Sequence, residues 1–311
     1  MTVVAHLFWR NCRIFLRDRV TLVFTATAPV VLMALFVIFF REMTARSIAR
    51  AIVGDGFAVD PMQLLGPGIM SDVYAMCDAW LFASCVTMST FACSLGMLAS
   101  FVEDRSSGRF SDYLVSPVRR GQLTLGYILS SFVVAVVVSS GFMALGQLWA
   151  AVKGQAVMTP TEALGTIGAI ALSSISYGTL HVFAVTFLAS QGGLGGYSLI
   201  GGIAVGFLSY CYVPPGGLSA PITNTVGIMP FAQSAALVRE PIMGPSMDRL
   251  IYLVNDPTLQ ESIRYNINKN FGADLYIDGR LLPPIAMVAM LSVLALLCAV
   301  IGSRRMGRVI R

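Results

Sequence analysis

The chain has 311 residues, of which 56% are hydrophobic and 12% are charged. Soluble domains carry about 25% charged residues, so this composition, with a mean hydropathy of +0.75, excludes an ordinary soluble protein. The net charge of +5 does not predict nucleic-acid binding, because membrane proteins retain lysine and arginine on their cytoplasmic flanks. A membrane-spanning helix needs about 20 apolar residues, so we expect an all-α polytopic membrane protein with about six spans.

The first predicted element is an amphipathic helix over residues 1–19. Apolar residues recur at helical spacing up to Leu16, whereas Arg10, Arg13 and Arg17 fall on another face. A helix of this kind lies in the headgroup layer of a membrane, which makes membrane lipids an expected partner. A soluble helix packed on another protein is the alternative.

Long apolar runs follow and predict the transmembrane helices. Their expected bounds are about 20–40, 79–102, 123–150, 162–189, 197–213 and 283–302. Between them we expect two extracellular segments. The first, 41–78, is predicted to be a loop with turn residues and a short helix after Asp60-Pro61. The second, 214–282, begins as a proline-broken, re-entrant or interfacial stretch and ends in a polar insert over 246–282. The whole chain, 1–311, is expected to form a single transmembrane domain.

Short local patterns predict further details. Thr159 is followed by Glu162 at the spacing of a capping box, and Asp256-Pro257 predicts the start of a helix. The glycine-rich residues 191–196 lack the Gly-Lys-Ser/Thr ending of a phosphate loop, so they predict a tight turn between two spans. His181 lies inside a span, where we expect it to be packed and hydrogen bonded rather than to relay protons.

The chain has six cysteines, and none of them forms a CxxC pair. Buried free cysteine behaves as a small hydrophobic residue, so we interpret these side chains as packing groups. Cys77 and Cys211 could both lie near the outer surface, which leaves a disulfide between them open.

The distribution of charge predicts the orientation. With six spans, both termini share one side with the charged residues 101–123, which lie between the second and third apolar runs. Arginines outnumber acids on that side, whereas the other side has longer loops and more acids than basic residues. Because lysine and arginine in short flanking segments set the orientation, we expect both termini and residues 101–123 to be cytoplasmic.

These charged residues carry a motif. An acid, an arginine and a glycine (Asp104, Arg105 and Gly108) precede Leu114, Ser116 and Pro117. Ser116-Pro117 has the form of an N-cap followed by the first helical position of the third span. The motif resembles the signature of permease subunits of type-2 ATP-binding-cassette (ABC) exporters. Ser106 departs from it, because the family often has a second acid there.

The resemblance extends to other parts of the chain. The runs 207–218 and 229–231 are similar to that family, and the long polar insert resembles multidrug-type permeases more than polysaccharide exporters. The resemblance implies that residues 103–120 form a coupling helix that an ATPase subunit receives. The coupling residues implied are Glu103, Asp104, Arg105, Gly108, Phe110, Asp112, Tyr113, Leu114, Pro117 and Arg120.

The resemblance also implies a solute path along the first, second and fifth spans. The residues expected to line it, the last two near an outer gate, are Thr25, Thr27, Ser84, Thr87, Tyr210, Tyr212 and Phe231. The solute implied is hydrophobic or amphipathic: a drug, antibiotic, peptide or lipid.

The function implied is that of the multi-pass permease of a bacterial plasma-membrane ABC exporter. Its implied partners are two copies of an ATPase subunit and a second permease, in a homodimer or heterodimer. ATP and magnesium would bind in the ATPase, so we expect no cofactor, no metal and no enzymatic activity in this chain. Independently of the resemblance, the sequence lacks a phosphate loop ending in Gly-Lys-Ser/Thr, so energy would come from a partner or an ion gradient.

Three alternatives stay open. One is an ion-coupled secondary transporter, and another is an ABC exporter of a lipid-linked polysaccharide. The third is a membrane-embedded enzyme, which is disfavoured because the predicted spans hold no Ser/His, paired-Asp or HExxH set.

Overall fold

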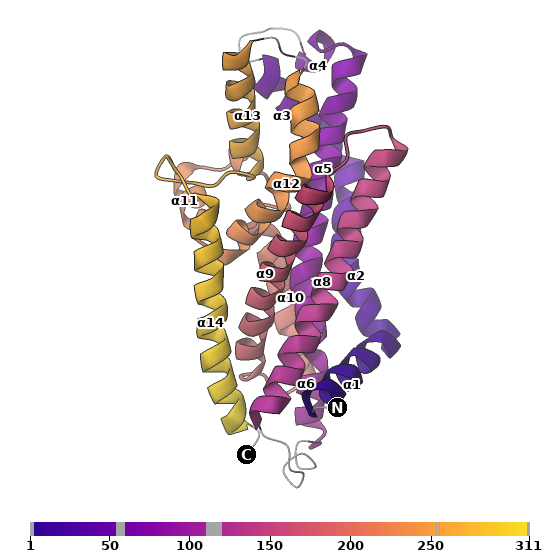
Figure 1. The fold of residues 1–311 in the computed structure, drawn as a ribbon, viewed down its shortest axis with the longest axis vertical. Helices are drawn as coiled ribbons and strands as arrows, with labels where there is room; N and C mark the ends of the chain where they lie inside the picture. Colours follow the sequence, from indigo (N-terminus) through magenta and orange to yellow (C-terminus); the bar gives the residue numbers. More distant parts are fainter. Residues whose placement is uncertain (1–2, 54–59, 110–119, 253, 255, 310–311) are drawn as a thin grey trace.

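The structure is a computed structural model that describes residues 3–53, 60–109, 120–252, 254 and 256–309. These residues are almost entirely helical, with one short antiparallel hairpin (Figure 1). The elements are α1 (Val3–Arg17), α2 (Arg19–Leu35), the π-helical η1 (Phe36–Phe40), α3 (Arg41–Val53), α4 (Pro61–Leu64), α5 (Pro67–Gly96), α6 (Ala99–Ser106), α8 (Arg120–Val152), α9 (Pro160–Val185), α10 (Gln191–Leu208), the 3-10 turn η2 (Pro215–Gly217), α11 (Ala220–Gly227), α12 (Pro230–Tyr252), α13 (Pro257–Phe271), β1 (Tyr276–Ile277), β2 (Arg280–Leu281) and α14 (Pro284–Val309).

Among the described residues, 5 helical runs are long and apolar enough to cross a membrane. They are Arg19–Val53, Pro67–Ser106, Gly121–Val152, Pro160–Val185 and Pro284–Met306. The chain is therefore an all-α polytopic membrane protein, as predicted. The remaining predicted span corresponds to α10, which has 18 residues. At 1.5 Å per residue it is about 27 Å long, but its glycines and Gln191 lower its hydropathy, and its role as a span stays a prediction.

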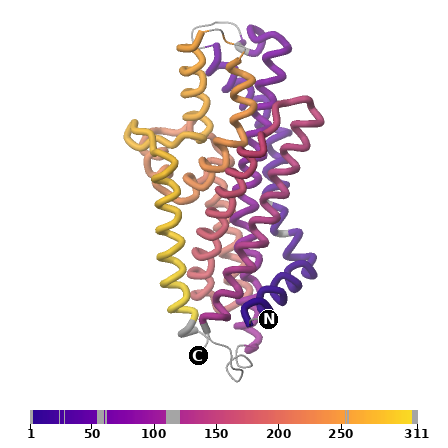
Figure 2. The backbone as a smooth tube through the Cα atoms, in the orientation of Figure 1, coloured from indigo at the N-terminus to yellow at the C-terminus, as the bar shows by residue number. Residues whose placement is uncertain are grey.

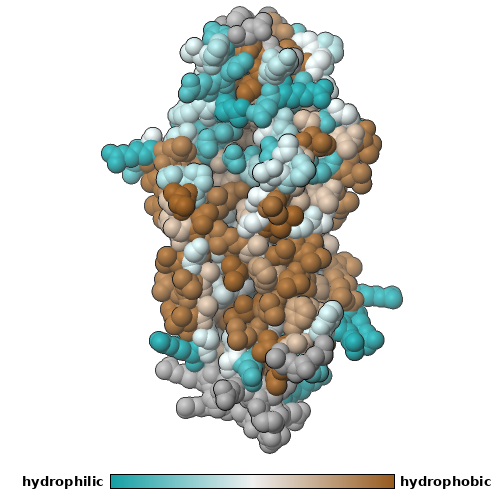
Figure 3. Space-filling view, in the orientation of Figure 1, coloured by the Kyte–Doolittle hydropathy of each residue, from teal (hydrophilic) through white to brown (hydrophobic). Residues whose placement is uncertain are grey.

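Apolar and hydrophilic side chains occupy separate parts of the molecular surface. On the face shown in Figure 3, apolar side chains form a broad band over the lower and middle parts of the molecule, and hydrophilic side chains gather towards the end away from the termini. Exposed apolar residues include Ile38, with 69% of its surface accessible, and Ile285, with 75%. Both termini lie at one end of the molecule, and α3, α4 and α13 lie at the other (Figures 1 and 2). We call these the termini end and the far end.

The prediction of a loop over 41–78 is wrong for most of its described residues, although the short helix expected after Asp60-Pro61 is present as α4. The chain continues from α2 through η1 into α3 as one helical run to Val53, and α5 begins at Pro67, with proline in the first turn, where it is tolerated. Ala45, Ile48 and Ala49 of α3 are fully buried and belong to the same apolar cluster as Trp80 of α5. The charged residues after the first apolar run therefore mark the end of the apolar stretch. They do not end the helix, because α3 packs on α5.

Two predictions near the fifth span also need correction. The glycine-rich residues 191–196 form the first turns of α10 rather than a tight turn, and the Ser190 hydroxyl caps that helix by accepting from the Gly193 amide at 3.2 Å. The helix predicted as the fifth span is therefore α10, Gln191–Leu208, instead of 197–213. The stretch predicted to be broken by prolines is broken as far as Pro230, into the short elements η2 and α11. From Pro230 onward the prediction is wrong, because α12 runs unbroken through Pro241 and Pro245. It packs against α5, α9 and α14, and these neighbours hold it helical despite the missing amide donors.

Other local predictions are confirmed. The capping box of Thr159 and Glu162 is formed at the start of α9, and Asp256 caps α13. Helices α8, α9 and α14 match the predicted third, fourth and sixth spans to within a few residues at most ends. All six cysteines lie within the described residues and are free and buried, so Cys77 and Cys211 do not form a disulfide.

Candidate functional site at the termini end

Asp104 is the centre of the candidate site. It lies near the end of α6, and only 1% of its surface is exposed. Arg10 of α1 donates to its Oδ1 at 2.8 Å, and Arg109 donates to the same oxygen at 3.3 Å. The Tyr127 hydroxyl of α8 donates to Oδ2 at 2.7 Å. A buried carboxylate requires partners of this kind, so this group of four residues, which we call the Asp104 hub, ties α1 and α8 to α6.

The packing of α1 on α8 positions Arg10 for this contact. A Cβ at Gly126 would lie 2.8 Å from the Cβ of Leu7, so glycine is needed for the two helices to approach so closely. Asn11 adds a buried hydrogen bond from its side-chain amide to the Ser130 hydroxyl, at 3.4 Å. The amphipathic helix predicted over residues 1–19 is present as α1, and part of its basic face binds α6 rather than facing solvent.

Arg105 extends the site to two more helices. Its Nη1 donates to the carbonyl oxygens of Leu188 at 2.6 Å and Thr186 at 3.3 Å, in the turn that follows α9. Helix ends leave such carbonyls without intrahelical donors. Arg305 of α14 binds the same turn, because its Nε donates to the Thr186 hydroxyl at 3.3 Å and its guanidinium lies 3.9 Å from the Phe187 ring centroid. The end of α6 is thereby connected to α9 and, through their shared turn, to α14.

The other predicted coupling residues are placed as follows. Glu103 is exposed and lies 3.4 Å from Arg109. Gly108 follows α6 with a φ of +75°, a left-handed conformation that favours glycine. Of Arg120 the structure describes the backbone, as the first residue of α8. The remaining predicted residues lie outside the described ranges: Phe110, Asp112, Tyr113, Leu114 and Pro117, together with the predicted N-cap at Ser116.

Three of the predicted path residues on α2 and α5 donate hydrogen bonds from their hydroxyls to backbone carbonyls of their own helix. Thr25 donates to the Thr21 carbonyl at 2.6 Å, Thr27 to the Val23 carbonyl at 2.7 Å, and Thr87 to the Ala83 carbonyl at 3.0 Å. Such back-bonding within a helix is the common behaviour of threonine. Thr25 and Thr87 are buried, whereas Thr27 is exposed. Their role in a solute path stays a prediction.

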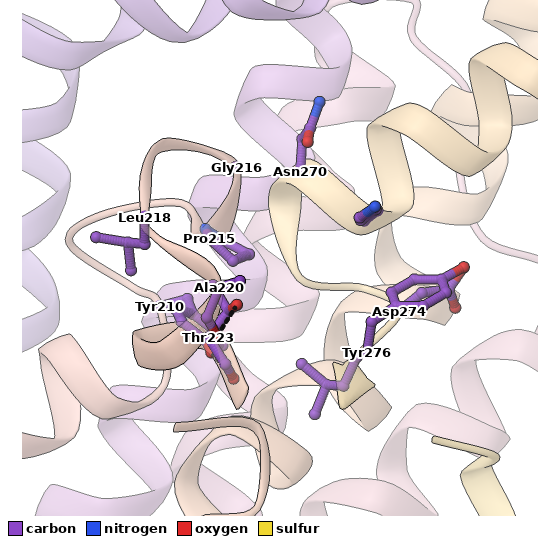
Figure 4. A pocket seen from close by; sticks show the side chains of 11 residues that line it. Tyr210, Pro215, Gly216, Leu218, Ala220, Thr223, Asn270, Asp274 and Tyr276 are labelled. Carbon is purple, nitrogen blue, oxygen red and sulfur yellow. Dashed lines mark hydrogen bonds between the residues drawn. The ribbon is translucent and has the colours of Figure 1, made fainter. Parts of the chain in front are cut away.

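The aromatic path residues lie further along the chain and have separate environments. Tyr210 lines a cavity of about 210 Å³ between the 210–223 region and residues 269–276, and its hydroxyl donates to the Thr223 carbonyl at 3.1 Å (Figure 4). Tyr212 packs over Gly206. The Phe231 ring stacks on that of Tyr177, with centroids 5.8 Å apart. Their shared path is likewise still a prediction.

Sequence reasoning missed Arg239, which is completely buried in α12. Its Nη2 donates to the Ser209 carbonyl at 2.7 Å and lies 3.4 Å from the Ser84 hydroxyl, while its Nη1 lies 3.5 Å from the Gly272 carbonyl. Its guanidinium also faces the Trp80 ring, 5.7 Å from the centroid. Among the described residues, these partners are neutral, and two of them are C-cap residues, of α10 and α13. The available signal was an arginine within an apolar stretch of the sequence.

His181 is packed and hydrogen bonded, as expected. Its Nδ1 lies 2.9 Å from the Tyr197 hydroxyl and its Nε2 lies 3.3 Å from the Phe91 carbonyl, so both ring nitrogens have partners. Within the described ranges, no group of three or more His, Cys, Asp and Glu side chains could hold a metal ion.

Comparison of this chain with models of protein families and with curated proteins gives no match. Its function therefore has to be inferred from its residues and their geometry.

Proposed function

We propose that the chain is the membrane-spanning permease of an ABC exporter in a bacterial plasma membrane, with both termini in the cytoplasm. It would move a hydrophobic or amphipathic solute outward together with a second permease. Two separate ATPase subunits would bind ATP and magnesium and hydrolyse the nucleotide, so this chain would itself be no enzyme. The observation that carries the proposal is the Asp104 hub, because it connects the start of the motif-bearing segment 103–120 to the membrane helices.

The hub supports a mechanical role for this segment. A force on residues 103–109 acts on α1 and α8 through the Asp104 contacts, of which the shortest is 2.7 Å, and on the turn after α9 through Arg105. Directed hydrogen bonds between charged groups fix the geometry of such a connection. Rigid-body movement of packed helices is a common way to turn such a displacement into a change of access.

The same segment offers groups that a partner could contact. Glu103 and Arg109 have 51% and 50% of their side-chain surfaces exposed, and no atom of the described residues lies within 4 Å of a Cβ placed at Gly108. Buried Asp104 and exposed Glu103 thus have different tasks in the proposal. Asp104 holds the segment to the bundle, and Glu103 faces the partner.

The proposal is tested by purifying the full chain in mild detergent and identifying the proteins that copurify. We expect an ATPase subunit in an equal amount, and one or two permease masses would distinguish a homodimer from a heterodimer. In inside-out vesicles, solute uptake should require ATP and should persist when the proton and sodium gradients are collapsed. Uptake that survives ATP depletion and stops with the gradients would replace the exporter by an ion-coupled transporter.

A further inference from the structure

The cavity that Tyr210 lines lies between two segments that connect helices of the bundle. One segment, 210–223, follows α10, and the other, 269–276, leads from the end of α13 into the hairpin that precedes α14 (Figure 4). Its volume is about 210 Å³, below the volume of about 300–1,000 Å³ that drug-sized molecules need. We call it the Tyr210 cavity, and its size suits one small polar group rather than a whole drug.

Two opposite charges line this cavity without neutralising each other. Lys269 and Asp274 both belong to its wall, and among the described residues neither takes part in an ion pair. The buried acids Asp104 and Asp78, by contrast, each pair with an arginine. A positive and a negative group that face one space and leave each other unpaired are the complement of a zwitterionic ligand.

Lys269 is exposed, and two tyrosines position its ammonium group. Its Nζ donates to the Tyr265 hydroxyl at 3.1 Å and lies 5.2 Å and 5.4 Å from the ring centroids of Tyr265 and Tyr276. Contacts with aromatic rings attract an ammonium but do not cancel its charge. An ammonium has three donors, so two of them remain for an anionic group such as a phosphate.

Asp274 is held in place while one of its oxygens stays available. The Asn268 side-chain amide donates to its Oδ2 at 3.2 Å, and within the described part of the chain no residue donates to its Oδ1. Glu240 of α12 interacts electrostatically with Asp274, which adds negative charge on this side of the cavity. Oδ1 can therefore accept a hydrogen bond from a cationic group of a ligand.

The cavity is formed before any ligand binds. Gly216 of η2 packs so closely on the end of α13 that a Cβ there would lie 2.8 Å from the side chain of Asn270. On the other side, Asn224 of α11 donates to the Asp278 carboxylate at 2.6 Å and accepts from its backbone amide at 3.1 Å. These contacts fix η2 and α11 against the polar segment, and a preformed site costs a ligand little ordering.

The surroundings of the cavity are those of a membrane surface. The candidate span α14 begins at Pro284, shortly after the residues that line the cavity. Apolar side chains are exposed on the adjoining elements, namely Ile222 of α11, Leu281 of β2 and Ile285 of α14. Residues at the ends of spans lie at the level of the lipid headgroups, and apolar neighbours there contact acyl chains. A ligand of this cavity can therefore be part of a lipid.

We infer that the Tyr210 cavity binds the headgroup of an aminophospholipid, with its phosphate beside Lys269 and its primary ammonium beside Asp274. A primary ammonium donates the hydrogen bond that Asp274 can accept, whereas a choline group has no N–H donor. The rings of Tyr265 and Tyr276 face Lys269, so they do not form the aromatic cage that recognises choline. The inference goes beyond the proposed function, because this chain binds the lipid without an ATPase.

The test is lipid competition read by native mass spectrometry of the full chain. The delipidated chain is incubated in detergent micelles with equimolar phosphatidylethanolamine, phosphatidylcholine and phosphatidylglycerol of the same acyl chains. We expect phosphatidylethanolamine to be retained about tenfold better than the other two, as one hydrogen bond between charged groups provides. Equal retention of the three lipids, or a preference for either of the other two, would overturn the inference.

Neutral variants assign the two ends of the headgroup. Asp274→Asn should lower retention of phosphatidylethanolamine to the level of phosphatidylcholine and leave phosphatidylcholine unchanged, because only the ammonium loses a partner. Lys269→Gln should weaken both lipids about three- to tenfold, because both have the phosphate and lose one unit charge a few ångströms away. Retention that does not change in either variant would contradict the assigned contacts.

Two control variants remove similar charges elsewhere. Lys153 is also an exposed lysine over an aromatic ring, with its Nζ 5.0 Å from the Trp149 ring centroid, and Glu261 is an exposed acid of α13. Neither lines the cavity, so Lys153→Gln and Glu261→Gln should leave the lipid preference unchanged. If they lower it as much as Lys269→Gln and Asp274→Asn do, the effect belongs to net charge and the inference falls.

Free O-phosphoethanolamine distinguishes a lipid from a soluble zwitterion. It should displace the lipid only at concentrations about a hundredfold higher or more, because it lacks the acyl chains that contact Ile222 and Leu281. Equal potency would overturn the assignment to a lipid. If lipid retention follows Lys269 and Asp274 but no ATPase copurifies, the lipid site stands and the exporter falls. If an ATPase copurifies and the variants retain the lipid unchanged, the lipid site falls alone.

Discussion

Two buried charges hold different parts of the bundle, and they are stabilised in different ways. Asp104, at the termini end, has oppositely charged partners, and both of its arginines are partly exposed, at 30% and 50%. Arg239, in α12, is fully buried and is held by neutral groups at helix ends. The partly exposed arginines of Asp104 can leave the carboxylate and bind water instead. The buried carbonyls that accept from Arg239 have no water to replace it.

This difference indicates different roles. The Arg239 contacts join α12 to the ends of α10 and α13 in a connection that cannot open without leaving polar groups unpaired. The Asp104 hub can open on its solvent side while the Tyr127 bond stays buried. We therefore expect the far end to behave as a fixed joint and the termini end as a movable one.

Truncation of Arg239 should have the largest effect on stability. Arg239→Ala should lower the free energy of unfolding by about 3–5 kcal/mol, because it leaves a cavity and deprives buried carbonyls of their donor. Arg239→Met fills the space and should cost less, about 1–3 kcal/mol. The measurement is unfolding of the purified chain in mixed micelles.

Arg264→Ala is the control for this prediction. Arg264 is an exposed arginine of α13 that pairs with Asp248 at 2.6 Å, and its loss should cost about 0–1 kcal/mol. A decrease of less than about 1 kcal/mol in the free energy of unfolding for Arg239→Ala would show that the buried guanidinium does not hold α12 to the ends of α10 and α13.

Neutralising Asp104 should have the next largest effect. Asp104→Asn removes the charge that holds Arg10 and Arg109 and should cost about 2–4 kcal/mol, whereas Glu103→Gln, at the neighbouring exposed position, should stay within about 0.5 kcal/mol of the original chain. A double-mutant cycle with Arg10→Met should give a coupling of about 1–3 kcal/mol. Additive effects of the two changes would mean that Arg10 and Asp104 do not interact.

The close approach of α1 to α8 gives a smaller effect with a control on the same helix. Gly126→Ala would bring its Cβ against the stem of Leu7 and should cost about 1–3 kcal/mol. Among the described residues, a Cβ at Gly121 meets no atom within 4 Å, so Gly121→Ala should be neutral or stabilising by up to about 1 kcal/mol. Equal stabilities of the two variants would place α1 further from α8 than described.

The smallest effect concerns pH. The hydrogen bonds from Thr21 lower the pKa of Asp18 below its ordinary value of 3.8, so its ionised form stabilises the fold above that pH, and this contribution is lost as the pH falls through the lowered pKa. Because Asp18 is exposed, we expect about 0.5 kcal/mol or less. Asp18→Asn should reduce the slope of unfolding free energy against pH below about pH 4, and an unchanged slope would assign it to other acids.

Much of the membrane fold could be predicted because apolar runs of sufficient length leave few alternatives. Helices α8, α9 and α14 follow from hydropathy, and the starts of α9 and α13 follow from their caps. The helical path of residues 41–53 and the unbroken course of α12 could not be predicted, because they depend on packing against helices far away in the sequence. The start of α10 was missed for a local reason, since Ser190 caps a glycine-rich turn that resembles a loop.

The candidate site was predictable only in part. Asp104 and Arg105 stand in a recognisable motif, but the role of Arg10 as a partner of Asp104 depends on how α1 crosses α8, which Gly126 permits. Arg239 was missed because its surroundings suggested an extracellular segment.

The most direct test of the account is the coupling of ATP hydrolysis to transport at Gly108. Gly108 and Gly154 both have positive φ, +75° and +66°, and a Cβ at either meets no atom of the described residues within 4 Å. Gly108→Val and Gly154→Val therefore impose similar backbone strain in different loops. With the copurified ATPase, Gly108→Val should lower substrate-stimulated hydrolysis and uptake by about tenfold or more, equivalent to roughly 1.4 kcal/mol, while Gly154→Val retains both. Equal coupling in the two variants would contradict the role of residues 103–120 as the joint with an ATPase.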